Sequence, residues 1–323
     1  MTALSTSPKN ASKALVVTAF AALYIIWGST YLAILIAVKS IPPFLMAGSR
    51  FIIAGLILYT WCRLKGEATP DIKSIGKISF SGILLLFIGN SGLVWVEQYL
   101  PSGFAAIVIA TVPLWFVILD RRQWKFHFAN KQIIVGLLIG FAGVLSLFAG
   151  NSGLKFWENK LQLISFIVLV LGSISWATGS LYAKYTPSNG STGMKASIQM
   201  LAAGLVSFIT GVGSGELQQF SWSNVSSDAV MAVIYLITFG SLIGYMSFVW
   251  LMTVRPPSLV GTYAYVNPVV AVFLGWLFAH EQITWHQIVA LAIILTGVII
   301  VNLSKEKISA YDSKTLARKS AVS

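Results

Sequence analysis

Long apolar stretches separated by short polar segments run through almost the whole chain. A bilayer crossing takes about 20 mostly apolar residues, and polar clusters, Pro and Gly mark where each stretch stops. The longest gaps between stretches, 63–77 and 213–228, are too short for a soluble domain. The pattern therefore predicts an all-α integral membrane protein with ten transmembrane helices, at 15–37, 42–62, 78–96, 101–119, 132–150, 161–183, 193–212, 229–251, 258–278 and 284–303.

Composition supports the membrane interpretation. Of the 323 residues, 56% are apolar and 10% are charged, whereas soluble domains carry about a quarter charged residues. The 19 Phe, 11 Trp and 11 Tyr exclude a disordered chain, and the single cysteine, Cys62, excludes a disulfide scaffold. The net charge of +12 is typical of basic cytoplasmic loops rather than of nucleic-acid binding.

Lys and Arg are distributed unevenly among the segments that join the spans. With the N-terminus inside, the inner segments and the two tails hold 18 of the 22 basic residues, and the outer segments hold only Lys39, Lys155 and Lys160. Basic residues concentrate in cytoplasmic loops, and a wrong span count would scramble this alternation. The distribution therefore supports ten spans and predicts that both tails, 1–14 and 304–323, face the cytoplasm.

The two halves of the chain, 15–150 and 161–303, carry matching motifs in the same order. The offset between partners is 149 residues for the first two matches and 154 to 155 for the others. Because each half has five spans, the second half enters the membrane from the opposite side. Inverted repeats recur in secondary transporters, with a site near the midplane, although duplication alone says nothing about activity. The matches are Trp27-Gly28-Ser29 with Trp176-Ala177-Thr178, Ala54-Gly55-Leu56 with Ala203-Gly204-Leu205, Pro113 with Pro268, and Gly143-Val144 with Gly297-Val298.

Four runs resemble a known family: YIIWGSTY at 24–31, MAGSRF at 46–51, GSISWA at 172–177 and YAYVNPVV at 263–270. Together with Glu281 after the ninth span, they resemble the EamA family of the drug/metabolite transporter superfamily, and within it the YedA-type exporters. The resemblance covers about residues 15–303. It implies a ten-helix fold of two inverted five-helix EamA repeats and export of small metabolites, including amino acids and drug-like molecules, across a bacterial inner membrane. In the first repeat Asp120-Arg121-Arg122 follow the fourth span, so only the acidic position of the second repeat fits the family pattern.

Pro113 and Pro268 are matched between the repeats and lie about 12 residues into their spans. Each lacks an N–H and disturbs the carbonyl four residues earlier, at Ile109 and Ala264. Inside hydrocarbon such a carbonyl needs protein or a wet cavity to bond it. Matched interruptions indicate a transporter site, whereas one proline alone is as readily a packing kink. We take the pair as candidate substrate-binding residues.

Polar and amphipathic side chains cluster near these prolines in the sequence. A buried asparagine amide is costly in a bilayer unless it is paired, so Asn90 and Asn267 either bond to a neighbouring helix or face a cavity. The further candidates are Thr111 in the fourth span, Tyr245 in the eighth, and Tyr263 and Tyr265 in the ninth.

Trp27 and Trp176 lie mid-span, away from the interfaces where Trp gathers. They either wall a cavity and stack on an aromatic or cationic ligand, or fill space between helices.

Arg50 is the one charge well inside a span, roughly 12 Å below the helix end at 1.5 Å per residue. A charge at this depth is costly unless it is paired or wet. Arg50 therefore holds a substrate carboxylate, or it snorkels or binds helix-end carbonyls or Glu97.

The acidic residues all fall in loops, tails or span ends, and the three histidines are peripheral. The spans thus offer no nucleophile–base pair and no metal cluster, which predicts no catalytic residue, metal or cofactor. The predicted function is alternating-access export of small organic solutes across a lipid bilayer, without nucleic acid. The alternatives are an integral membrane enzyme and a non-transporting receptor or scaffold. Substrate, proton coupling and oligomeric state stay open.

Overall fold

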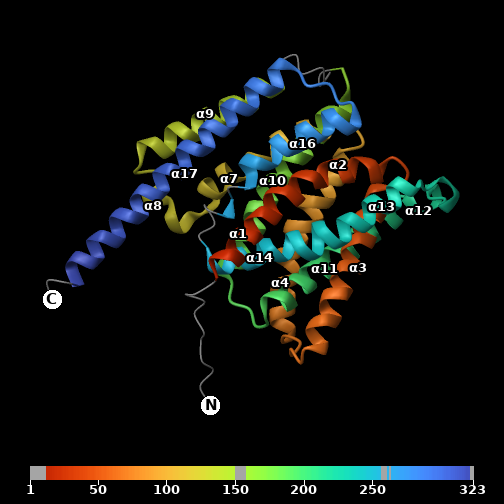
Figure 1. Cartoon of the computed structure of the whole chain (residues 1–323), viewed down its shortest axis with the longest axis horizontal. Helices are drawn as coiled ribbons and strands as arrows, with labels where there is room; N and C mark the ends of the chain where they lie inside the picture. Colours follow the sequence, from red (N-terminus) through yellow and green to blue (C-terminus); the bar gives the residue numbers. More distant parts are fainter. Residues whose placement is uncertain (1–11, 150–157, 256–259, 262, 321–323) are drawn as a thin grey trace.

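The computed structural model describes residues 12–149, 158–255, 260–261 and 263–320, and these residues form helices and their connections (Figure 1). Seven helices are long and apolar enough to cross a membrane, and three further apolar helices are shorter. The predicted all-helical membrane fold with ten spans is confirmed.

The helices of the first half begin and end close to the predicted spans. Span 1 is α1 (Lys13–Ala21), η1 (Ala22–Ile26) and α2 (Trp27–Val38); span 2 is α3 (Pro43–Leu64); span 3 is α4 (Ile72–Gly82), η2 (Ile83–Ser91) and α5 (Gly92–Val96); span 4 is α6 (Ser102–Ile109) and α7 (Val112–Leu119); span 5 is α9 (Lys131–Ala149), which follows the short α8 (Trp124–His127).

In the second half, span 6 is α10 (Lys160–Tyr185); span 7 is α11 (Thr192–Gly213), followed by the short α12 (Glu216–Gln219); span 8 is α13 (Ser227–Tyr235), η5 (Leu236–Tyr245) and α14 (Met246–Val254); span 9 is α16 (Tyr263–Ala279); and span 10 is α17 (Trp285–Ser320). The last helix continues well past residue 303, so the segment that the sequence assigns to a C-terminal tail is helical as far as Ser320.

Counterpart helices of the two repeats pack against each other. Gly48 lies against Phe208 and Gly55 against Leu201, so α3 and α11 run antiparallel. In α9 and α17, Gly136 lies against Val301 and Gly143 against Ile294, which is again antiparallel. Antiparallel counterparts are what a duplication with inverted topology requires.

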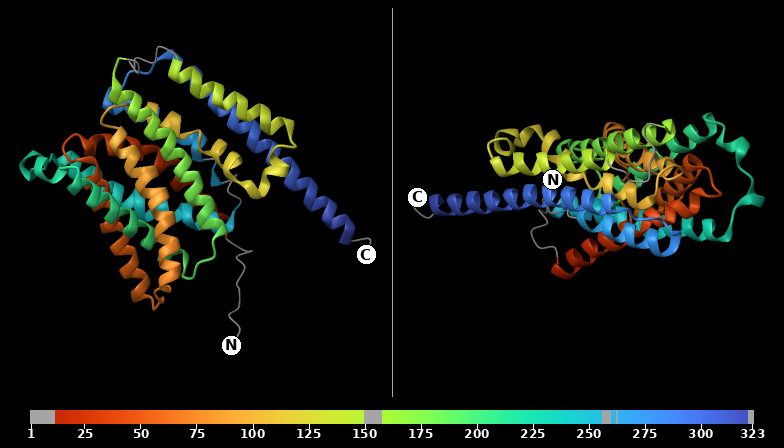
Figure 2. Two further views of the ribbon diagram at one scale, coloured as in Figure 1. Left: turned by 180° about the vertical axis from the view of Figure 1, so that it is seen from behind. Right: turned by 90° about the horizontal axis from the view of Figure 1, so that it is seen from above.

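The α9–α17 pair lies side by side at one edge of the molecule (Figures 1 and 2). The small residues noted in the sequence make this contact, because Gly136 and Gly140 face Gly297 across the interface. Small residues let transmembrane helices approach closely enough for backbone contact.

We expect Gly297→Ala to destabilise the protein. A Cβ at residue 297 would overlap the backbone of Gly140 and lie 2.5 Å from the Gly136 carbonyl oxygen, and overpacking costs about 1–3 kcal/mol. Thermal unfolding in detergent should show a lower midpoint for this variant. Gly76→Ala is the matched control, since a Cβ there meets nothing within 4 Å; equal midpoints for the two variants would contradict the packing argument.

Glutamates bind the N-termini of helices across the repeat boundary. Glu216, after α11, accepts the backbone N–H groups of Phe44 (3.2 Å) and Leu45 (2.9 Å) at the start of α3. Glu281, after α16, accepts those of Ser102 (2.7 Å) and Gly103 (3.1 Å) at the start of α6. The first N–H groups of a helix lack intrahelical partners and favour a negative charge. Each carboxylate therefore ties a second-repeat helix to its first-repeat counterpart.

Glu97 differs from these two glutamates. It directly follows α5 at a span end, as the sequence predicts, but its side chain is only 2% exposed, and neither carboxyl oxygen has a hydrogen-bond partner among the described residues. Burial, and then the nearby Glu281 carboxylate, raise the pKa of Glu97 well above its usual range. A carboxyl group is therefore buried at the end of span 3, although the sequence places no Asp or Glu inside a span.

We expect Glu97→Gln to stabilise the protein at alkaline pH. The pKa of this carboxyl group in the folded protein exceeds its value of about 4.3 in the unfolded chain. Such a group stabilises the fold fully at pH values below the unfolded pKa, and this stabilisation is lost as the pH rises through the folded pKa. The glutamine is isosteric and always neutral. The melting temperature of the Glu97→Gln protein should therefore exceed that of the wild type by more at pH 8 than at pH 5. Asp228→Asn, at an exposed site, is the control; parallel pH profiles for wild type and Glu97→Gln would contradict the burial argument.

Candidate functional site

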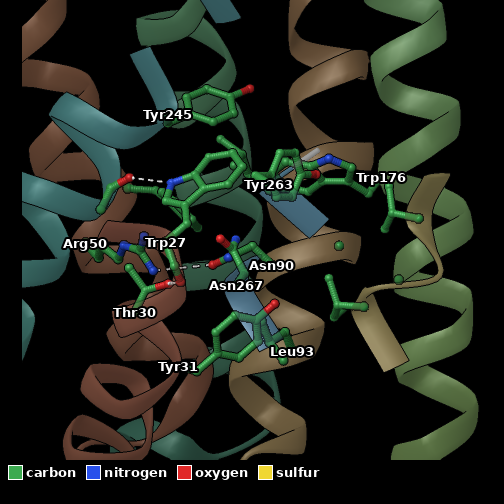
Figure 3. Close-up of a pocket in the computed structure, with 17 residues that line it drawn as sticks. Trp27, Thr30, Tyr31, Arg50, Asn90, Leu93, Trp176, Tyr245, Tyr263 and Asn267 are labelled. Carbon is green, nitrogen blue, oxygen red and sulfur yellow. Dashed lines mark hydrogen bonds between the residues drawn. The ribbon is translucent and has the colours of Figure 1, made fainter. Parts of the chain in front are cut away.

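A cavity of about 60 Å³ lies between the two repeats, near the middle of the helices (Figure 3). Seven of the eleven candidate residues from the sequence line it, and they come from spans 1, 2, 3, 6, 8 and 9: Trp27, Arg50, Asn90, Trp176, Tyr245, Tyr263 and Asn267. The α9 and α17 helices contribute no lining residue among those described. The repeat motifs and the isolated charge thus converge on one place.

The cavity wall is largely aromatic. The indole of Trp27 meets Trp176 and Tyr263 edge-on, with ring centroids 5.5 Å and 5.2 Å apart. Phe248, which the sequence reasoning missed, lies 5.3 Å from Trp27 and 5.4 Å from Trp176. Such edge-to-face contacts are favourable. The two tryptophans therefore line the cavity and also pack between helices, and ligand stacking on them stays a prediction.

Arg50 is 3% exposed and points at the cavity (Figure 3). Its Nε donates to the Ser241 hydroxyl at 3.0 Å, and its Nη1 donates to Asn90 Oδ1 at 3.4 Å. Burial rules out snorkelling, and Arg50 forms no ion pair with Glu97 or any other described carboxylate. Its hydrogen-bond partners are the neutral Ser241 and Asn90, so a substrate carboxylate at Arg50 stays a prediction.

Local backbone changes create the cavity. Spans 1, 3 and 8 each contain a π-helical segment, η1, η2 and η5, and such segments are frequent at functional sites. η2 carries Asn90, and η5 carries Ser241 and Tyr245. Within η5 Gly240 also leaves room for Arg50, since a Cβ there would lie 2.9 Å from Nη2. The sequence does not predict these segments.

Asn267 bonds to a neighbouring helix and also lines the cavity. With its amide nitrogen facing the backbone, it donates to the carbonyls of Tyr24 and Leu23, each at 3.2 Å, and of Tyr263 at 3.1 Å. Leu23 and Tyr24 belong to η1. Asn267 thus satisfies carbonyl groups within the π-helical part of span 1.

The two prolines behave differently. Span 4 is broken at residues 110–111, with Pro113 at the start of α7, whereas Pro268 lies inside the continuous helix α16. Neither proline lines the cavity. Thr111 does not line it either, because it is buried and its hydroxyl donates to the Val108 carbonyl at 2.7 Å. The side chain of Tyr265 lies outside the described residues.

A second, larger cavity of about 740 Å³ lies at the end of the bundle that the charge distribution assigns to the cytoplasm. We call it the vestibule; its wall includes residues of α4, α10, α11 and α14. Phe248 lines the vestibule and contacts the aromatic wall of the central cavity. Beside it, Tyr245 donates to Gln199 (2.8 Å), and Gln199 donates to Ser81 (2.9 Å). This hydrogen-bond chain and Phe248 separate the two cavities.

Sequence reasoning missed Phe248, Tyr31 and Gly240, of which the last two line the central cavity. Phe248 lies one helical turn after Tyr245, so the spacing along span 8 is the one feature that could have indicated it. Tyr31 likewise follows Trp27 at i+4 on the same face of α2. Gly240 has no side chain, and its role depends on contact with Arg50, 190 residues away in sequence.

The chain is similar in sequence to curated transporters and in fold to a solved structure. The chain is 40% identical over 288 residues to the uncharacterized inner membrane transporter YedA of Escherichia coli K12, covering 88% of this chain and 89% of the relative. It is 26% identical to the uncharacterized transporter YvbV of Bacillus subtilis, covering 87% and 89%. A solved crystal structure with 17% identity superposes with a TM-score of 0.63, over 91% of this chain and 99% of the other, which supports the fold.

The family model confirms the duplication. The EamA-like transporter family matches twice, over residues 14–149 and 163–303, close to the repeats delimited by the motif offsets. The chain therefore belongs to the EamA-like transporter family and is a membrane transporter rather than an enzyme.

Proposed function

We propose that the chain is a multi-pass inner membrane protein that exports small organic metabolites, amino acids or drug-like solutes, by alternating access. The observation that supports this most strongly is the central cavity, which both repeats line and which carries one buried cation and an aromatic wall. Inverted repeats place a site between two halves that exchange conformations. The named Escherichia coli relative is an inner membrane transporter.

The two cavities fit one conformation of such a cycle. Ligand pockets are usually about 300–1,000 Å³, so the central cavity of about 60 Å³ is too small for a solute and the vestibule of about 740 Å³ is large enough. We infer that a solute enters the vestibule and reaches the central cavity when Phe248 and the Tyr245–Gln199 bond move aside. In this proposal the vestibule opens to the cytoplasm, and both termini lie on that side, as the distribution of basic residues predicts.

Trp176→Ala should reduce transport about tenfold or more, because the lost ring contacts and buried area exceed about 1.4 kcal/mol. The measurement is uptake into proteoliposomes of a labelled panel of amino acids, organic carboxylates and amines, with and without an imposed pH gradient, on whichever solutes the wild type transports. Trp222→Ala is the matched control, since that ring is 80% exposed and lies outside the spans. Equal uptake by the two variants would contradict the site assignment and leave transport itself intact.

A C-terminal fusion tests the orientation. The basic residues concentrate on the vestibule side, which we therefore assign to the cytoplasm together with the C-terminus. Green fluorescent protein fused after Ser323 should then fluoresce, and alkaline phosphatase fused there should be inactive. Fusions after Ser40, between spans 1 and 2, should give the reverse result. An active phosphatase at the C-terminus would overturn the proposed orientation.

A further inference from the structure

We propose that the substrate is an organic carboxylate with an apolar, ring-bearing body and no ammonium group, and that its carboxylate binds Arg50 after passing over the vestibule lysines. This inference rests on the proposed transport function and specifies its substrate class. It is carried by the charges and donors that line both cavities.

Arg50 provides the first argument. Its guanidinium is buried, and its bonds go to the neutral Ser241 and Asn90. A buried charge without a counter-ion is unfavourable, and a carboxylate offsets it because the planar guanidinium binds carboxylates through two parallel hydrogen bonds. Nη2, which lies beside Gly240, donates no hydrogen bond to a described residue, so the guanidinium keeps a donor for such a ligand.

The absence of an opposing charge provides the second argument. Among the described residues that line the central cavity, none is acidic. An ammonium group would meet Arg50 without a carboxylate to neutralise it, so the site favours an anion over a zwitterion or a cation. The buried indole N–H of Trp176 makes no hydrogen bond of normal length with a described residue, and the Tyr263 hydroxyl is the group it interacts with.

The vestibule provides the third argument, independently of Arg50. Four lysines line it, Lys73, Lys77, Lys184 and Lys195, against one acid, Asp71. The Asp71 carboxylate is already engaged, because it accepts from the Ser74 N–H at 3.1 Å and from the Asn189 amide at 2.9 Å. A cavity with an excess of positive charge raises the local concentration of anions.

The aromatic wall indicates the rest of the ligand. Trp27, Trp176 and Tyr263 already contact one another edge to face, and Phe248 closes the wall on the vestibule side. An apolar ring replaces these contacts when it enters between them. The two requirements together, a carboxylate at Arg50 and a ring against the indoles, define an amphipathic monoanion.

Binding of four matched probes to the purified protein in detergent, measured by calorimetry, tests the class. The probes are 3-phenylpropionate, 3-phenylpropionamide, phenylalanine and 2-phenylethylamine. The carboxylate should bind at least about tenfold more tightly than each of the others, the effect of one charge-assisted pair. An amide or phenylalanine that binds as tightly as the carboxylate overturns the proposal, and so does the absence of binding by all four.

Arg50→Gln should abolish the preference for the carboxylate over the amide while amide binding persists, and Arg50→Lys should retain part of it. Arg63→Gln, an exposed arginine on the same helix, is the matched control and should keep the full preference. A preference unchanged in Arg50→Gln overturns the assignment. Amino-acid uptake that survives Arg50→Gln would overturn this substrate class while the transport function stands.

The vestibule lysines are tested by rate. The double variant Lys73→Gln with Lys77→Gln should slow initial uptake of 3-phenylpropionate several-fold at low ionic strength, and the difference should shrink in 0.5 M salt, where the screening length falls to roughly 3–10 Å. Uptake of phenylalanine in the same vesicles should change less. A rate independent of both substitutions and of salt would remove the vestibule from the proposal.

Discussion

The requirement that every backbone polar group in an apolar bilayer find a partner governs the whole structure. A regular helix meets it without help, so each departure from a regular helix needs a compensating group. The π-helical segment η1 is compensated by Asn267, whose amide donates to two of its carbonyls. The N-termini of α3 and α6 are compensated by Glu216 and Glu281. In these three cases the compensating residue comes from the other repeat, so the irregular segments also hold the two halves together.

The same requirement explains why the binding cavity lies where it does. Irregular backbone is tolerated at membrane depth only inside the protein or beside a wet cavity, and η2 and η5 both border the central cavity. These segments bring Asn90 and Ser241 to Arg50. Two of the regular spans, α9 and α17, pack on each other at the edge and contribute no described residue to the cavity.

Much of this could be predicted from the sequence because it depends on length and charge. An apolar run of about 20 residues forms a span whatever it packs against, and the repeat motifs place Trp27 and Trp176 together. The break before Pro113 is consistent with its missing N–H, but Pro268, which lacks the same group, lies inside a continuous helix. The burial of Glu97 and the position of Phe248 depend on which helix faces which, and one sequence does not contain that information. The position of Thr111 could not be predicted, because a hydroxyl that bonds within its own helix looks the same in sequence as one that faces a cavity.

The unequal behaviour of the two prolines bears on how inverted halves can work as a transporter. Two identical halves would respond equally to a solute from either side, whereas here span 4 is broken and span 9 is continuous. The continuous helix carries Tyr263 and Asn267 and fixes the wall of the cavity against span 1. The broken helix is interrupted at residues 110–111, directly beside the lining residues Ile109 and Val112. In the proposed transport cycle the cavity has to expand before a solute can occupy it, because its volume is only about 60 Å³. We expect the interrupted span 4 to move rather than the continuous span 9, since the contacts of Tyr263 and Asn267 hold span 9 against span 1.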